Sequence, residues 1–259
     1  MSGGSVVAVP GVELRYEIHG EGRPVLLIAG LADDSSSWGA QVEALAPKRR
    51  VVCFDNRGCG RSSTPPGPYS TREMAADAHA VIAALGLAPV DVVGSSMGGA
   101  IAEWLAIDHP GDVDRLLLTN SWGGPEPYLE WLFDFWDELA ADPPRLAEVG
   151  RLFSFSPAFI GQHTERVLEL TTGPPPEIAG FRAALAACRG HDALDRLGEI
   201  RHPTCVVAAS ADIVTPPRLS TALAESISSA ELRTVESGHM ICWERPDALN
   251  AILLEFFDG

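Results

Sequence analysis

The sequence predicts an α/β protein with a mostly parallel sheet that helices cover on both faces. Short runs of Val, Ile and Leu recur along the chain, and stretches with apolar residues three and four positions apart lie between them. The 259 residues are 46% hydrophobic, which is enough for one sizeable core. Buried parallel strands that alternate with amphipathic helices are typical of this class.

The apolar runs predict the strands in order along the chain. They lie at 25–30, 50–55, 90–94, 115–120 and 204–210. In the segment 11–20 apolar and polar residues alternate, which indicates a half-exposed antiparallel strand at the edge of the sheet. The helical spacing after residue 70 predicts a helix with Thr71 as its N-cap.

The alternation of strands and helices breaks after residue 120. The segment 121–190 holds ten of the 18 aromatic residues and two proline-rich stretches. We therefore expect a helical cap over 121–190, inserted into a core formed by 1–120 and 191–259. Most of its aromatic residues should attach the cap helices to the sheet, and some should line an apolar pocket. The predicted substrate-binding residues are Trp122, Trp131 and Phe135.

Composition narrows the classes of partner. The chain has 19 Lys and Arg and 35 Asp and Glu, so its formal net charge is −16. This negative charge argues against nucleic acid or a membrane as partner. Five cysteines without CxxC pairs argue against a disulfide framework or a zinc site and favour a reducing cytoplasm. The first 20 residues lack the pattern of a signal peptide, so we expect a soluble cytoplasmic protein. The oligomeric state stays open.

A candidate nucleophile follows the third buried strand, in Gly-Ser-Ser-Met-Gly-Gly at 94–99. A strand that turns sharply into a helix can lift one side chain clear of the sheet if small residues lie two positions before and after it. Gly94 and Gly98 bracket Ser96 in this way, whereas Ser95 has valine and methionine at these positions. The alternative is a tight glycine-rich turn with an idle serine.

A serine nucleophile needs a base and an acid that orients the base. His239 lies in a loop after a strand and before the C-terminal helix, and Asp212 directly follows the strand at 204–210. Both should reach the carboxyl edge of the sheet. Asp212 could instead serve only the turn before Pro216. The other histidines are expected on the surface or in structural roles, although His191 could enter the pocket.

The negative oxygen that forms during acyl transfer needs two preorganised donors. We expect one to be the backbone amide of Met97, next to the nucleophile. The other should be the amide of Leu31, in the loop after the strand at 25–30.

These segments resemble the α/β-hydrolase superfamily over essentially the whole chain. The residues that carry the resemblance are the elbow at 94–99, the loop Asp-Asn-Arg-Gly-Cys-Gly-Arg-Ser at 55–62, and the segments around Asp212 and His239. Within the superfamily the chain is most similar to small esterases and lactonases, such as 3-oxoadipate enol-lactonase and polyketide methylesterases. This resemblance implies hydrolysis without a metal or organic cofactor, and a structural Asp–Arg pair in the loop at 55–62.

The chain departs from the family pattern before the expected oxyanion amide. Many members carry His-Gly there, whereas this chain has Ala29 and Gly30. The loss of the imidazole removes a side chain that often braces the loop. The next acidic residues, Asp33 and Asp34, could bind polar groups of a substrate or cap the helix that contains Trp38, and capping is the preferred interpretation.

The sequence therefore predicts a serine hydrolase that cleaves a carboxylic ester or lactone of a small to medium, partly apolar molecule. The same triad could instead serve a C–C bond hydrolase, a thioesterase or an acyl-transferring cyclase. A ligand receptor built on a hydrolase scaffold is a further alternative.

Overall fold

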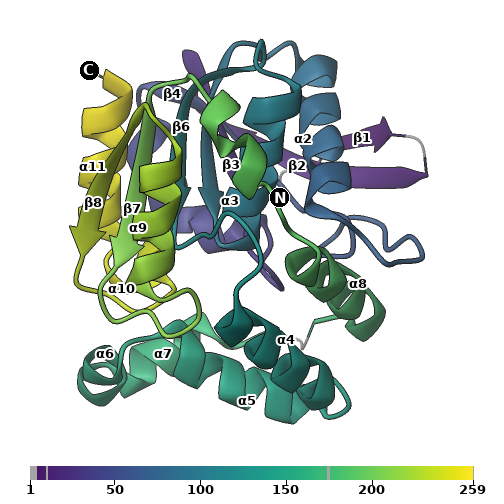
Figure 1. Ribbon diagram of the computed structural model, residues 1–259, viewed down its shortest axis with the longest axis vertical. Coiled ribbons are helices and arrows are strands. Elements are labelled where there is room, and N and C mark those ends of the chain that lie inside the picture. Colours follow the sequence, from purple (N-terminus) through teal and green to yellow (C-terminus); the bar gives the residue numbers. More distant parts are fainter. Residues whose placement is uncertain (1–4, 10, 174–175, 259) are drawn as a thin grey trace.

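The computed structural model describes residues 5–9, 11–173 and 176–258, which form an α/β fold around one eight-stranded sheet (Figure 1). The strands are β1 (Ser5–Val9), β2 (Val12–His19), β3 (Arg23–Ile28), β4 (Arg49–Phe54), β5 (Val90–Ser95), β6 (Val113–Thr119), β7 (Thr204–Ala209) and β8 (Ala230–Val235). Their order in the sheet is β1-β2-β4-β3-β5-β6-β7-β8. All neighbours from β4 to β8 pair in parallel, which confirms the predicted fold class.

The antiparallel strand predicted at 11–20 is present, but it does not lie at the edge. β2 pairs with β4 on one side and with β1 on the other, both antiparallel. The short segment Ser5–Val9 supplies the edge strand, which the sequence analysis missed. Its apolar run is only four residues long, Val6–Val9, and most of the strand is exposed, so the sequence signal is weak.

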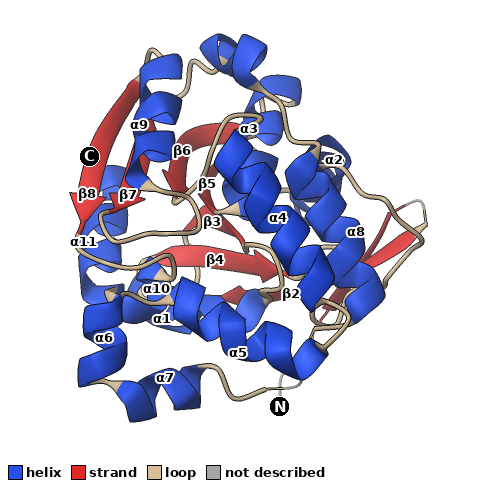
Figure 2. Ribbon diagram, turned by 60° about the horizontal axis from the view of Figure 1, so that its bottom comes forward, coloured by secondary structure: helices blue, strands red, loops and turns tan. Residues whose placement is uncertain are grey.

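Helices cover both faces of the sheet (Figure 2). They are α1 (Gly39–Leu45), α2 (Thr71–Leu85), α3 (Met97–Asp108), α9 (Pro217–Ser226), α10 (Ile241–Glu244) and α11 (Pro246–Asp258), with 3-10 turns η1 (Ser35–Trp38) and η2 (Leu194–Glu199). α2, α3 and α9 pack on one face, and α1 and α11 on the other. Successive residues of a strand point to opposite faces: Leu26 and Ile28 contact the first layer, Val25 and Leu27 the second.

Five helices lie between β6 and β7 in the chain, beyond the ends toward which β7 and β8 point (Figure 1). They are α4 (Pro127–Leu139), α5 (Pro143–Ser154), α6 (Pro157–Gln162), α7 (Thr164–Leu170) and α8 (Ile178–Arg189). Prolines occupy the first turns of α4, α5 and α6, where their missing N–H costs no hydrogen bond. The proline-rich stretch at 141–145 thus marks the start of α5, while the stretch at 172–177 lies partly outside the described residues.

The N-cap predicted for α2 is wrong by one residue. Ser70 is the cap, since its side chain accepts a hydrogen bond from the amide of Glu73, and Thr71 is the buried first residue of the helix. All five cysteines are free and buried. Among the described residues, no helix is both long and apolar enough to cross a bilayer.

Candidate active site

Ser96 occupies the sharp turn between β5 and α3. Its backbone has φ +54° and ψ −120°, a conformation that is costly for a residue with a side chain. The surrounding hydrogen bonds hold it there, because its amide donates to Thr119 O at 2.9 Å and its carbonyl accepts from Ser121 Oγ at 3.0 Å. The turn separates Ser96 from Ser95, which remains the last residue of the strand.

The two glycines around Ser96 are required by close backbone contacts. A Cβ at Gly94 would lie 2.4 Å from the carbonyl oxygen of Gly98, and a Cβ at Gly98 would lie 2.1 Å from the carbonyl oxygen of Ile28. Neither contact could be relieved by rotating a side chain. The spacing on which the nucleophile was predicted therefore has its expected steric cause.

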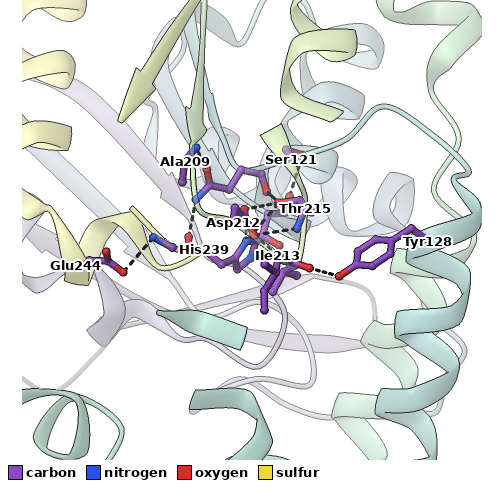
Figure 3. A network of polar contacts seen from close by, with 12 residues as sticks. Ser121, Tyr128, Ala209, Asp212, Ile213, Thr215, His239 and Glu244 are labelled. Atoms are coloured by element: carbon purple, nitrogen blue, oxygen red, sulfur yellow. Dashed lines mark hydrogen bonds and ion pairs between the residues drawn. The ribbon is translucent and has the colours of Figure 1, made fainter. Parts of the chain in front are cut away.

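Asp212 and His239 meet at the carboxyl edge of the sheet, as predicted (Figure 3). Asp212 Oδ2 lies 2.8 Å from His239 Nδ1. His239 lines the same cavity as Ser96. Burial by itself lowers the pKa of His239, but the charge and hydrogen bond of Asp212, with a smaller contribution from Asp33, outweigh it, so this pKa lies above its ordinary value.

Neighbouring residues fix the Asp212 carboxylate. Its Oδ1 accepts hydrogen bonds from the amides of Val214 and Thr215, at 2.7 and 3.0 Å. Thr215 Oγ1 lies 2.8 Å from Asp212 Oδ2 and equally far from the carbonyl oxygen of Asn120. Asn120 itself, at φ +50°, donates to the carbonyl oxygen of His239 at 2.5 Å. The sequence analysis missed both residues, although Asn120 directly follows β6 and Thr215 lies three residues after Asp212.

The loops that carry the acid and the base are both tied to the helices between β6 and β7. Tyr128 on α4 donates its hydroxyl proton to the carbonyl oxygen of Ile213, next to Asp212 (Figure 3). Glu244 accepts from the amide of Gly238 at 3.0 Å and from the amide and hydroxyl of Ser156 at 2.8 and 2.7 Å. Through Glu244, the loop that carries His239 is thus hydrogen-bonded to Ser156, which lies between α5 and α6.

The two predicted oxyanion donors lie on either side of the elbow. In the described part of the chain, neither the amide of Leu31 nor that of Met97 donates to another backbone group. A Cβ at Gly30 would lie 3.3 Å from Ser96 Cβ, so the loop of Leu31 passes close to the nucleophile. The bracing that histidine gives elsewhere in the family is supplied differently here, because Asn56 Nδ2 donates to the carbonyl oxygen of Ala29 at 3.0 Å.

A cavity of about 180 Å³ opens beside Ser96 and His239. Its apolar wall comes from the inserted helices and from the loops after β3, β7 and β8. The lining includes Leu31, Trp136, Leu146, Phe153, Phe181, Val214 and Met240. A second cavity of about 430 Å³ shares Ala32, Pro176 and Phe181 with it, so the two adjoin.

The predicted substrate-binding aromatics lie outside this cavity. Trp131 is 77% exposed and Phe135 40% exposed, while Trp122 is buried against Phe133 and His191. Trp131 and Phe135 are four positions apart on α4 and therefore share one face, which is the face turned to solvent. Trp136 of the same helix lines the cavity instead.

A buried polar chain lies beneath the elbow and gives His191 the structural role expected of it, and His191 does not line the cavity. His191 Nε2 is 3.0 Å from Glu103 Oε2, and its Nδ1 is 3.0 Å from Thr71 Oγ1. Both ionisable side chains are inaccessible to solvent. Burial raises the pKa of Glu103 against the opposing effect of His191. Ser121 Oγ lies 3.5 Å from Glu103 Oε1 and also donates to the Ser96 carbonyl.

We expect Glu103→Leu to lower the free energy of unfolding by about 3 kcal/mol, because it leaves a fully buried imidazole without its partner. Urea denaturation measures this change. The double variant Glu103→Leu/His191→Leu should recover part of the loss. The exposed pair Arg145–Glu148 is the control, since Arg145→Gln should change stability by no more than about 0.5 kcal/mol. An equally small effect of Glu103→Leu would contradict this role.

The loop at 55–62 is structural, but Asp55 and Arg57 do not pair. Arg57 binds Asp77 through Nε and Nη2, at 2.6 and 2.7 Å, and also contacts Glu73. Asp55 accepts from the amides of Ser35 and Arg61, both at 2.9 Å. The loop therefore connects β4 to α2 and to the turn that follows the oxyanion loop.

Asp34 caps η1 as expected, because its Oδ1 accepts from the amide of Ser36 at 2.8 Å. Asp33 caps nothing and lies in the wall of the catalytic cavity.

One group of side chains among the described residues has metal-binding residue types within reach of one another. It consists of His79, His109 and Asp112 and lies toward the amino edge of the sheet, away from Ser96. The two imidazoles stack at 3.8 Å with planes 6° apart. Because a metal lies in the plane of each imidazole that binds it, the two rings cannot share an ion in this arrangement.

Comparison with known proteins gives the same fold and a related chemistry. The family model described as alpha/beta hydrolase fold matches residues 23–246. The chain is 34% identical to a protein of Azorhizobium caulinodans named "Putative carbamate hydrolase RutD", over 94% of each chain. A protein of the same name from Caulobacter segnis is 33% identical, over 94% of this chain and 96% of its own.

Solved structures agree over nearly the full length. A hydrolase from Pseudomonas aeruginosa has a TM-score of 0.92 and 28% identity, covering 100% of this chain and 99% of that one. The enol-lactonase from Burkholderia xenovorans has a TM-score of 0.90 and 26% identity, covering 98% and 100%. Since the family model spans most of the sequence, the chain belongs to the α/β-hydrolase fold family and is a hydrolase that resembles small esterases and lactonases.

Proposed function

We propose that this hydrolase cleaves a carboxylic ester or lactone through an acyl-enzyme on Ser96. The observation that carries the proposal is the hydrogen bond of 2.8 Å between Asp212 and His239, at a cavity that the strained Ser96 also lines. A base fixed by a buried carboxylate beside a serine at a strand–helix turn suits acyl transfer.

In the first half-reaction His239 takes the proton of Ser96 as the hydroxyl oxygen attacks the substrate carbonyl. The amides of Leu31 and Met97 stabilise the negative oxygen of the tetrahedral intermediate. The C–O bond to the leaving group then breaks, and His239 protonates the departing alkoxide. In the second half-reaction His239 deprotonates a water molecule that attacks the acyl-enzyme, and Ser96 regains its proton. Asp212 stabilises the imidazolium in both steps.

The shape of the cavity supports a small acyl group. With about 180 Å³ beside Ser96 and aromatic walls from Phe153 and Phe181, an apolar acyl chain of a few carbons fits best. A larger substrate would extend into the adjoining cavity. In this proposal the segment 121–190 acts as the cap that closes over the substrate and keeps bulk water out.

A second candidate is hydrolysis of a carbamate. The curated relatives with 32–34% identity over about 94% of this chain carry that name. A carbamate carbonyl lies between oxygen and nitrogen, and Ser96 would attack it by the same route. The ester and lactone assignment takes precedence here because the nearly full-length structural likeness includes an enol-lactonase.

Intact-protein mass spectrometry after treatment with a fluorophosphonate, combined with turnover assays, tests this function. We expect one adduct on Ser96 and sustained release of nitrophenolate from p-nitrophenyl butanoate. A panel of a γ-lactone, a thioester, an O-alkyl carbamate and a vinylogous diketone, followed side by side, identifies the bond that is cleaved. An adduct without sustained release from any ester or lactone would contradict the proposal and favour acyl transfer or a receptor. Absence of the adduct would contradict the nucleophile.

A further inference from the structure

Asp33 has no structural task and lies beside the nucleophile. A Cβ built on Gly30 would lie 3.3 Å from Ser96 Cβ and 3.5 Å from Asp33 Oδ2. Ser96 Cβ and Asp33 Oδ2 thus lie on the same side of Gly30. The distance between these two atoms is at most the sum of the two distances just given. Asp33 also lines the cavity together with Ser96 and His239.

The carboxylate of Asp33 is unpartnered. In the described part of the chain no backbone or side-chain donor forms a hydrogen bond with it. Its neighbours differ in this respect, because Asp34 accepts from Ser36 and Asp55 accepts from two backbone amides. Its side chain is partly exposed toward the cavity, so a group from outside the chain can reach it and supply the missing partner.

The surroundings of Asp33 favour a cationic partner. The described residues that line the cavity include no Lys or Arg, and apart from Ser96, Ser154 and His239 they offer mainly apolar groups. Burial raises the pKa of Asp33 to about 7, with His239 acting to lower it and Asp34 to raise it further. A nearby ammonium group would favour the ionised form and recover part of the cost of burial.

We propose that Asp33 is a specificity residue that binds an ammonium group of the substrate, so that the enzyme prefers amine-bearing esters to neutral esters of the same shape. This inference rests on the proposed function only in taking the cavity beside Ser96 as the substrate site. A carboxylate-bearing substrate would meet Asp33 without a compensating cation and bind poorly.

Two pairs of nearly isosteric esters test the preference at either end of the ester bond. Butyrylcholine and 3,3-dimethylbutyl butanoate differ in the charge of the alcohol part. The second pair, p-nitrophenyl 3-aminopropanoate and p-nitrophenyl butanoate, differs in the charge of the acyl part. Affinities are measured by titration calorimetry on the Ser96→Ala variant, so turnover is not needed. We expect the cationic member of at least one pair to bind about 10-fold or more tightly, which corresponds to about 1.4 kcal/mol.

The double variant Ser96→Ala/Asp33→Asn should lose this preference to within about 3-fold, as expected when a carboxylate is replaced by a neutral amide of the same shape. Ser96→Ala/Asp34→Asn is the matched control and should keep it, because Asp34 caps η1.

The pH dependence gives a readout that loss of structure would not produce. Between pH 6 and 8 the preference should grow as Asp33 ionises. Protonated His239 also repels the cationic ester at low pH. The Asp33→Asn variant retains His239, so the pH dependence of its preference measures the contribution of His239 separately. The other ionisable groups beside Asp33 are Asp34 and the thiols of Cys59 and Cys242. Burial raises the pKa of the Cys59 thiol to about 12 and that of the Cys242 thiol above its usual range, so both thiols stay neutral.

Equal affinity within both pairs, or a preference that persists in the Asp33→Asn variant, would overturn the inference. Turnover of p-nitrophenyl butanoate by the unmodified enzyme tests the proposed function by itself. Because the affinities are obtained without turnover, failure of either proposal can be recognised separately.

Discussion

Ser96→Ala is expected to lower kcat for p-nitrophenyl butanoate by about 10⁶-fold, because the acyl-enzyme can no longer form. The fold should remain intact, since Ser96 donates no side-chain hydrogen bond to another described residue and alanine has the same cost at φ +54°. Circular dichroism and thermal unfolding check the fold, and stopped-time assays at high enzyme concentration measure the residual rate.

Ser95→Ala is the matched control for this variant. Ser95 is as buried as Ser96, at 8% against 9% exposure, and lies one residue earlier in the chain. It remains in β5 at the end of the ladder with β6, so its hydroxyl should contribute little to turnover. Comparable losses in the two variants, or turnover by Ser96→Ala within about 100-fold of the unmodified enzyme, would contradict the assignment of Ser96.

The sharp turn at Ser96 could be predicted from sequence because its geometry is encoded locally. A Cβ at Gly94 or at Gly98 would clash with the backbone of a neighbouring segment, and among the serines of this stretch only Ser96 has glycine two positions before and after it. Asp212 and His239 are far apart in sequence, but each follows a strand of one parallel sheet. Parallel pairing brings such positions to the same edge, which is why the sequence also placed them together.

The cavity wall could not be predicted in the same way. α4 carries aromatic residues on more than one face, and which of them border the cavity depends on how the inserted helices pack on one another. Trp131 and Trp136 are equally apolar in sequence, yet the first is exposed and the second lines the cavity. The spacing of Leu129, Leu132, Phe133 and Trp136, three and four positions apart, does mark the inward face of α4, but it does not show which residue of that face borders the cavity.

Prediction from sequence also fails to separate the roles of two adjacent residues of the same type. Asp33 and Asp34 are adjacent and chemically identical, and either could cap the following turn. The extended backbone of Asp34, at φ −124° and ψ −174°, lets its side chain reach the amide of Ser36. Asp33 has no capping role and lines the cavity instead. This difference between the two residues follows from backbone angles that cannot be predicted from the sequence pattern.

Asp212→Asn is expected to lower kcat by about 10⁴-fold. The carboxylate oxygen that lies 2.8 Å from His239 Nδ1 would be replaced by an amide group that can present N–H to the ring. The ring would then favour the tautomer with its proton on Nε2, which cannot accept the proton of Ser96. The amides of Val214 and Thr215 still have an oxygen to bond, so the loop should keep its conformation.

The pH profile distinguishes this mechanism from a general loss of structure. His239 must be neutral to act as a base, so kcat/KM falls as the pH drops through its pKa. Because Asp212 raises that pKa above the ordinary value near 6.5, the acidic limb of the unmodified enzyme should lie above pH 6.5. Removal of the carboxylate lowers the pKa, so the limb of Asp212→Asn should move to lower pH even as kcat falls.

Thr215→Val provides the comparison for Asp212→Asn. It removes one hydrogen-bond partner of Asp212 but leaves the carboxylate and its bond to His239. We expect a loss of about 10-fold, since one hydrogen bond to a charged group contributes about 1.5 kcal/mol, with the acidic limb nearly unchanged. If Asp212→Asn kept more than a tenth of the original kcat with an unmoved limb, Asp212 would serve only its turn, and another carboxylate would have to support the base.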